Sequence, residues 1–386
     1  MPLRSVICSA LAVGALGLAA PAAANAAFTV VASPNAFTGN NDLQGVGASS
    51  ATDAWAVGTL AGAFEDSAIG TPTEHFNGTA WTVVPSPDAV HIDDELNAVA
   101  DLSPTNAWAV GLVKGAGTKS GSPLIVHWNG LSWQTVAAPA GVSGVLRAVS
   151  GDSASDVWAV GDDARGHAIA FRFSGASWSA TPLPAAGVDT LAGVKAFAPT
   201  DVWAVGRQIV TASPQTRTLI MHWNGSAWSI VPSANPNPTT DSLRAVDGTS
   251  SSDLWAVGQQ APSEATTGAG PGTRTLTEHF NGSRWSAVTS PNTGDEDTLS
   301  GVAAVSPTAV STVGNFEDRS GSIPVDRTLA EDWSGTRWSI VPSGNVGTTD
   351  NLLTGAARIP GTSGTWAVGF HLTATGPDQT LIERGS

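Results

Sequence analysis

The stretch Asp156-Val157-Trp158-Ala159-Val160-Gly161 decides the fold, because it recurs along the chain. Four close copies and two divergent ones share its pattern: Asp53–Gly58, Asn106–Gly111, Asp201–Gly206, Asp253–Gly258, Ala309–Gly314 and Gly364–Gly369. The seven copies are 45 to 56 residues apart, a period typical of propellers, solenoids and other repeat arrays. One such repeat is too short to bury its apolar face alone, so neighbouring repeats must pack on one another.

The third repeat predicts four short strands. These are Leu146–Val149, Val157–Val160, His167–Phe173 and Trp178–Pro182, which we name strands a to d, and they are separated by small and polar turn residues. The turn between strands c and d is Ser174-Gly175 here and Asn-Gly in four other repeats, a strong hairpin signal. Four antiparallel strands repeated about every 50 residues are typical of propeller blades.

The two ends of the chain predict how the ring closes. After the seventh copy of the motif the chain supplies one more strand c, Thr380–Arg384, and then stops. The stretch Phe28–Pro34 resembles Trp81–Pro87, which includes a strand d. We therefore predict an all-β, seven-bladed propeller with four antiparallel strands per blade, whose last blade is completed by the N-terminal strand. This closure would remove exposed sheet edges.

The 15 tryptophans all occupy repeat positions. Aromatic platforms for sugars are one interpretation, but a position filled in nearly every blade indicates packing between blades, where large rings contribute most buried area. We therefore assign a structural role to the six tryptophans of the recurring motif: Trp55, Trp108, Trp158, Trp203, Trp255 and Trp366.

The order of the motifs resembles known families. Leu-x-x-Val, then Asp-x-Trp-Ala-Val-Gly, then Trp-Asn-Gly-x-x-Trp is similar to tectonin-type lectin propellers, and more loosely to kelch propellers (such as the central domain of galactose oxidase) and Asp-box propellers. It is most similar to secreted bacterial propellers with Trp-Ala-Val-Gly and Trp-Asn-Gly repeats. The resemblance spans Phe28 to Arg384 and implies the fold; the serine–aspartate pair of an Asp-box is absent.

The first residues predict export. Arg4, a short apolar run and the small-residue segment ending at Ala26 are typical of a secretory signal peptide. The sequence thus predicts a signal peptide over 1–26 and a single propeller domain over 27–386. Cys8, the one cysteine, lies in the signal, so the mature chain has neither disulfide nor cysteine ligand. The mature net charge is about −16, which argues against nucleic acid, and we expect neither membrane insertion nor an oligomer.

Residue types also restrict the chemistry. The chain has no tyrosine, which excludes a copper radical oxidase and a sialidase with a tyrosine nucleophile. Histidines recur on strand c at His75, His127, His222 and His279, but equivalent positions on different blades diverge from the axis and are too far apart to share one ion. The aspartate two residues before each motif tryptophan is expected to bond the backbone of its turn.

Six carboxylates precede strand a by one or two residues: Asp42, Glu95, Asp189, Asp241, Asp297 and Asp350. Strand a is innermost in a propeller, so the six would form an acidic ring at the channel mouth, where Ca²⁺ is a candidate ligand because it takes six to eight oxygens. The alternative is ordinary turn chemistry. We keep the six as candidate ligand-binding residues and assign no catalytic residue.

The long, variable links d→a and b→c leave the blades on one face, and function in repeat scaffolds concentrates where loops vary. The shortest b→c link, Asp162–Gly166 in the third blade, should leave a notch in this rim. We therefore expect a secreted, extracellular, non-catalytic binding module for carbohydrate or a cell-surface protein. The alternative is a metal-dependent hydrolase or lyase that uses carboxylates at the channel mouth. Fold alone does not choose between them.

Overall fold

The computed structural model describes residues 27–386 except 37, 62–70, 88–93, 114–120, 185–186, 211–214, 238–239, 262–271 and 295. The predicted signal peptide and most of the long b→c links therefore lie outside the described residues. Within the described part the chain forms 28 strands and no helix, and hence no helix there has the length and apolar character to cross a bilayer. The prediction of an all-β chain is confirmed.

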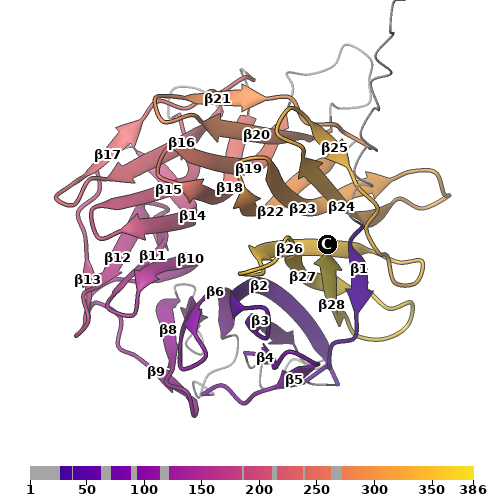
Figure 1. The fold of residues 1–386 in the computed structure, drawn as a ribbon, viewed down its shortest axis with the longest axis horizontal. Coiled ribbons are helices and arrows are strands. Elements are labelled where there is room, and N and C mark those ends of the chain that lie inside the picture. Colours follow the sequence, from indigo (N-terminus) through magenta and orange to yellow (C-terminus); the bar gives the residue numbers. More distant parts are fainter. Residues whose placement is uncertain are drawn as a thin grey trace, which may run out of the picture.

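Antiparallel pairing groups the strands in sets of four. Five sets form separate sheets, and the other two are joined in one larger sheet by a single parallel pair, Thr216 with Thr240. We call each set a blade and number the blades along the chain from β2. Figure 1 shows the blades around a central axis, with the first strand of each blade nearest to it. This is the propeller arrangement that the repeats predict.

The strands fall into four classes by their place in the blade. The innermost strands (a) are β2 (Asn40–Ser50), β6 (Glu95–Ser103), β10 (Gly144–Ser153), β14 (Val188–Ala198), β18 (Thr240–Ser250), β22 (Asp297–Ser306) and β26 (Asn351–Arg358). The second strands (b) are β3 (Asp53–Ala61), β7 (Asn106–Val113), β11 (Asp156–Asp163), β15 (Asp201–Ile209), β19 (Asp253–Ala261), β23 (Ala309–Asp318) and β27 (Thr365–His371).

The third strands (c) are β4 (Thr73–Phe76), β8 (Ser122–Trp128), β12 (Ala168–Phe173), β16 (Thr216–Trp223), β20 (Arg274–Phe280), β24 (Val325–Trp333) and β28 (Gln379–Gly385). The outermost strands (d) are β5 (Trp81–Val83), β9 (Trp133–Thr135), β13 (Trp178–Ala180), β17 (Trp228–Val231), β21 (Trp285–Val288), β25 (Trp338–Ile340) and β1 (Thr29–Val31).

Strands a and b are longer than predicted. In blade 3 the sequence predicts them to end before the turn, but β10 and β11 continue to its base, where Ser153 pairs with Asp156. The sequence predicts a turn from Gly151 to Asp156, but most of these small and polar residues belong to the paired end of the hairpin. Backbone pairing does not require an apolar side chain. The turn between c and d follows the prediction: Gly78 has φ of 91°, and Asn77 Oδ1 accepts the backbone N–H of Thr79.

The N-terminal strand closes the ring as predicted. Strand β1 pairs antiparallel with β28, with Thr29 opposite Arg384 and Val31 opposite Ile382. Phe28 is 3% exposed, and its backbone N–H donates to the Pro342 carbonyl of blade 6. The first and last strands, β1 and β28, thus share one blade, beside the chain terminus marked C in Figure 1.

The core between adjacent blades contains aromatic clusters among its valines, leucines and alanines. The Trp55 ring of blade 1 lies 4.8 Å from Trp128 and 4.9 Å from Trp133, both in blade 2. The last junction repeats this arrangement, because the Trp366 ring of blade 7 lies 4.9 Å from Phe76 and 5.2 Å from Trp81 of blade 1. Equivalent contacts place the other four motif tryptophans between blades: Trp108, Trp158, Trp203 and Trp255.

Candidate functional site at the channel mouth

Each innermost strand carries a β-bulge near its start. In blade 3 the pairing register shifts between Leu146 and Ala148, so Arg147 is left without a paired residue on β11. The same shift occurs in every blade, and bulges often redirect a side chain near functional sites. The bulged residues in chain order are Gln44, Asn97, Arg147, Ala192, Arg244, Ser300 and Thr354.

The bulge explains the glycine that ends the recurring motif. A Cβ atom built on Gly161 would lie 1.9 Å from the Val145 carbonyl oxygen, a distance that no side chain tolerates. The same close approach of backbone recurs at the equivalent glycine of every blade, including Gly258 in blade 5. Glycine is required there because the bulged strand comes so near.

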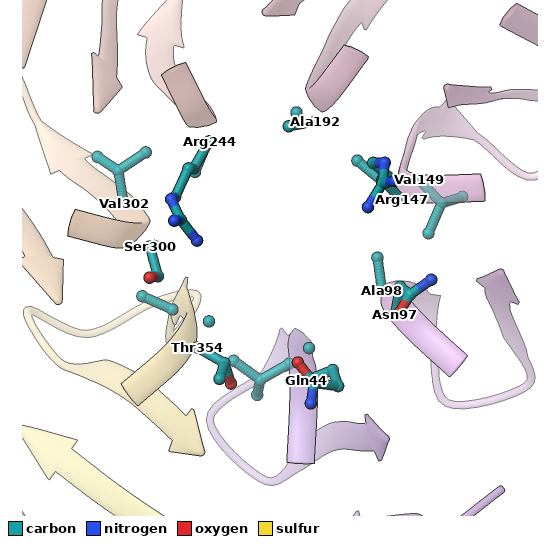
Figure 2. Close-up of a pocket in the computed structure, with 18 of the residues that line it drawn as sticks. Gln44, Asn97, Ala98, Arg147, Val149, Ala192, Arg244, Ser300, Val302 and Thr354 are labelled. Carbon is teal, nitrogen blue, oxygen red and sulfur yellow. The ribbon is translucent and has the colours of Figure 1, made fainter. Parts of the chain in front are cut away.

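The bulged residues surround a cavity of about 360 Å³ on the propeller axis. Figure 2 shows their side chains around this opening. The next two lining positions are almost uniform, a glycine or alanine followed by a valine in six of the seven blades. The bulge is therefore the one lining position at which the blades differ strongly in chemistry.

The bulges lie at the end of the channel where the long links leave the blades. Each bulge is the third to fifth residue of its strand a, close to the end that the d→a link enters. In blade 3, Arg147 Nε donates to Oδ1 of Asp162, the residue before the last of β11. We call this opening the channel mouth. The channel mouth lies on the face that carries the long d→a and b→c links, where the sequence predicts the functional surface.

Two of the neutral bulged residues also connect blades. Asn97 Nδ2 donates to the Leu146 carbonyl at 2.9 Å, and Thr354 Oγ1 donates to the Leu43 carbonyl at 2.8 Å. Gln44 and Ser300, by contrast, make no hydrogen bond through their side chains within the described part of the chain. These two side chains can therefore bind a ligand without first breaking a contact.

Three arginines gather at one side of the channel mouth. Arg147, Arg207 and Arg244, on blades 3, 4 and 5, line an adjoining cavity of about 220 Å³. Arg244 Nη2 donates to the neutral Oε1 of Gln259 at 2.8 Å. Enclosure by the channel wall, and then repulsion from Arg207, lower the pKa of Arg244. The mouth is thus locally basic in a chain whose formal net charge is −15.

The structure places three of the six predicted acidic residues inside turns and blade junctions. Asp189, Asp241 and Asp297 are buried, and burial raises the pKa of Asp189 and Asp241. Asp241 Oδ2 accepts the Asn237 backbone N–H at 3.0 Å, and Asp297 Oδ1 accepts that of Thr293 at 2.9 Å. Asp241 and Asp297 thus bond the backbone of the d→a link that precedes them, as the turn alternative expects.

The remaining members of the set are partly exposed. Asp350 Oδ1 accepts the Asp326 backbone N–H of blade 6 at 2.9 Å, an arrangement that Asp189 repeats with Ala168 of blade 3. Burial, and then repulsion from Asp378, raise the pKa of Asp42 to about 6.

The structure does not bring these carboxylates to one point. None of the six, Glu95 included, is among the residues that line the channel cavity. Within the described residues, no group of three or more His, Cys, Asp or Glu is placed to hold a metal ion. Calcium binding by the acidic ring stays a prediction.

The recurring histidines and aspartates form pairs. His75 Nε2 lies 2.7 Å from Asp53 Oδ1, and its ring lies 4.5 Å from that of Trp55. Burial acts to raise the pKa of Asp53, but hydrogen bonds from His75 and Ser49 outweigh it and lower that pKa. The same pairing recurs between His222 and Asp201 and between His279 and Asp253. In blade 2 asparagine replaces the aspartate, in the pair of His127 with Asn106, and in blade 3 arginine replaces the histidine, in the pair of Arg172 with Asp156.

Two sets of buried or channel-lining residues were not predicted from the sequence. The bulged residues carry a signal that could have been read, a variable position between an invariant leucine and a Gly/Ala-Val pair. Four glutamates on third strands, all fully buried, interrupt otherwise apolar positions: Glu74, Glu278, Glu331 and Glu383. Burial raises the pKa of each, to about 8 for Glu74 and Glu331 and about 7 for Glu278 and Glu383.

No protein-family model matches the chain, and comparison with curated proteins finds no match. Among solved structures the chain is similar to Ycf48 bound to a D1 peptide, with a TM-score of 0.54 and 14% identity over 92% of this chain and 94% of that one. It is also similar to a chain of the mitotic checkpoint complex, with a TM-score of 0.55 and 10% identity over 100% and 99% of the two chains.

A polysaccharide lyase, an ulvan lyase bound to -[GlcA(1-4)Rha3S]-, matches with a TM-score of 0.53 and 10% identity over 93% of this chain and 94% of that one. At such identities the likeness shows the fold alone. The fold and the pairing therefore define this chain as a β-propeller with a polar channel mouth. The neighbours include peptide-binding proteins and enzymes, and this diversity is usual for the fold.

Proposed function

We propose that this chain is an extracellular, non-catalytic binding protein that recognises its ligand at the channel mouth. The observation that carries the proposal is the variation at the bulges: seven blades present nearly uniform lining residues except at this one position. A rigid scaffold that varies at a few convergent positions is suited to recognition. Carbohydrate is the ligand class that the resemblance to tectonin-type propellers implies, and a cell-surface protein is the other candidate.

The residue types at the mouth support binding over catalysis. The bulges supply amide, hydroxyl and guanidinium groups, and the predicted carboxylates are not among the residues that line the cavity. The alternative, a metal-dependent hydrolase or lyase, needs carboxylates at this opening as ligands or as general acids and bases.

A glycan array, supplemented with extracellular proteins, tests the proposal with the mature protein. Gln44→Ala combined with Ser300→Ala removes two mouth side chains that make no side-chain hydrogen bond in the described structure, so binding should weaken about tenfold without loss of stability. The matched control is Gln134→Ala, an exposed glutamine on β9, which should bind as the parent protein does. Equal binding by all three proteins would place the ligand elsewhere, and turnover of a bound glycan would favour the enzyme.

A further inference from the structure

The three arginines at the channel mouth frame a space. Arg147 and Arg244 belong to blades 3 and 5, and the bulged residue of the blade between them, Ala192, ends at a methyl group. Figure 2 shows Arg147 and Arg244 on either side of Ala192. Any longer side chain at position 192 would fill this space, so the alanine leaves room for a group that both arginines can reach.

The positive charge of the three arginines is only partly balanced by nearby carboxylates. Arg147 is ion-paired with Asp162. Across the described part of the chain, no carboxylate forms an ion pair with Arg207 or Arg244, and the partner of Arg244 is the uncharged Gln259. Two like charges at one opening repel each other, and the repulsion is relieved when an anion lies between them.

We infer that Arg147, Arg207 and Arg244 form a binding site for the oxyanion of an acidic saccharide, a carboxylate or a sulfate. This inference rests on the proposed function and deepens it, because it names the ligand chemistry of the same mouth. Arginine presents planar, forked N–H donors that match carboxylate and sulfate oxygens in pairs. The link beside Arg147 consists of residues 164–167, between β11 and β12, so blade 3 contributes the shortest b→c link of the rim at this point.

The rest of the mouth favours a saccharide over an acidic peptide. Among the residues that the structure describes, those lining the channel include no aromatic side chain, so charge and hydrogen bonds provide the affinity of this lining. Gln44 and Ser300 come from blades 1 and 6 and line the same opening as the arginines. Amide and hydroxyl groups of this kind bind the hydroxyls that accompany the acid group of a sugar.

The test measures binding of four probes to the mature protein at low salt: a galacturonate hexamer, a sulfated hexasaccharide, a neutral hexasaccharide and poly-glutamate. The variant Arg207→Gln combined with Arg244→Gln removes the two unbalanced charges and leaves Arg147 with Asp162. Arg284→Gln is the matched control, because Arg284 is exposed beside the Asn281-Gly282 turn between strands c and d of blade 5, away from the mouth.

We expect an acidic hexasaccharide to bind and the double variant to bind it about 100-fold more weakly, since each hydrogen bond between charged groups is worth roughly tenfold or more. The Arg284→Gln control should stay within about twofold, and added salt should weaken binding by the parent protein. Whether galacturonate or the sulfated probe binds more tightly identifies the oxyanion. The melting temperature of the double variant should not fall, because the change removes a repulsion.

Three results would overturn the inference. They are failure of both acidic saccharides to bind, binding that the double variant retains, and equal affinity for poly-glutamate. A neutral glycan whose binding depends on Gln44 and Ser300 but not on the arginines would refute the oxyanion site and leave the proposed function standing. The experiment therefore distinguishes failure of the proposed function from failure of the oxyanion site alone.

Discussion

The buried glutamate Glu74 should make the stability of the propeller depend on pH. Glu74 lies on β4 with its carboxylate fully buried, and within the described structure neither of its oxygens has a hydrogen-bond partner. Burial raises the pKa to about 8 from the ordinary value of 4.5. The folded protein therefore keeps a proton at neutral pH that the unfolded chain releases.

The sign and size follow from proton linkage. Because the folded pKa is the higher one, the stabilising contribution is complete below about pH 4.5 and is lost as the pH rises toward 8. Between pH 5 and pH 7 the free energy of unfolding should fall by about 2.5 kcal/mol on account of this group. Glu74→Gln has nearly the same shape and no titration, so the free-energy difference between variant and parent should grow by that amount over the same interval.

Urea unfolding followed by tryptophan fluorescence at pH 5, 6, 7 and 8 measures this difference. Other titrating groups are common to both proteins and cancel, and any packing cost of the amide is a constant offset. Glu278→Gln is the matched variant: its pKa is about 7, because burial is partly opposed by the Ala234 N–H that donates to the carboxylate. The difference in free energy of unfolding between Glu278→Gln and the parent should therefore stop growing about one pH unit lower than it does for Glu74→Gln. A difference that does not change with pH would refute the reasoning.

Three further predictions address the fold and the acidic ring. Gly258→Ala would place a Cβ 2.1 Å from a backbone carbonyl oxygen and should lower the free energy of unfolding by about 1–3 kcal/mol, whereas Gly321→Ala, with its nearest atom at 3.6 Å, should be close to neutral in the same urea series. Deletion of 28–34 removes strand β1 and should cause aggregation or loss of the cooperative melt; an unchanged melting temperature would mean that closure contributes nothing. The acidic-ring hypothesis predicts that Ca²⁺ raises the melting temperature, that EDTA lowers it, and that Asp241→Asn with Asp297→Asn removes the response; a melt indifferent to Ca²⁺ leaves these residues as turn residues only.

The blade architecture and its closure could be predicted from the sequence because they depend on patterns that repeat. The motif around Trp158 predicts a strand and an aromatic contact wherever it occurs, and the Asn-Gly pairs predict hairpins from local backbone preference alone. Closure was readable for the same reason. The copy of a strand d at Phe28–Pro34 had one place to pair, beside the strand c at Thr380–Arg384, and β1 pairs there.

The channel mouth could not be predicted in the same way. The acidic ring was inferred from the position of carboxylates before strand a, but position along a strand does not say whether a side chain faces the axis or the preceding turn. Asp297, for example, is taken up by the backbone of its own turn. The bulge decides which side chain faces the opening. Its signal in the sequence is the three-residue spacing of the leucine and the valine around it, which departs from the two-residue alternation of a regular strand.

By itself, the sequence determined that this chain repeats a four-stranded unit and which strand completes the last blade. Both features follow from local strand and turn preferences and from the packing of similar repeats against one another. Only the tertiary structure decided which side chains share the opening. Arg147 and Arg244 occupy the bulges of blades 3 and 5, and Arg207 lies on strand b of blade 4, yet the three line one cavity. Ring geometry brings them together, because seven inner strands converge on one axis and each bulge turns one side chain toward it.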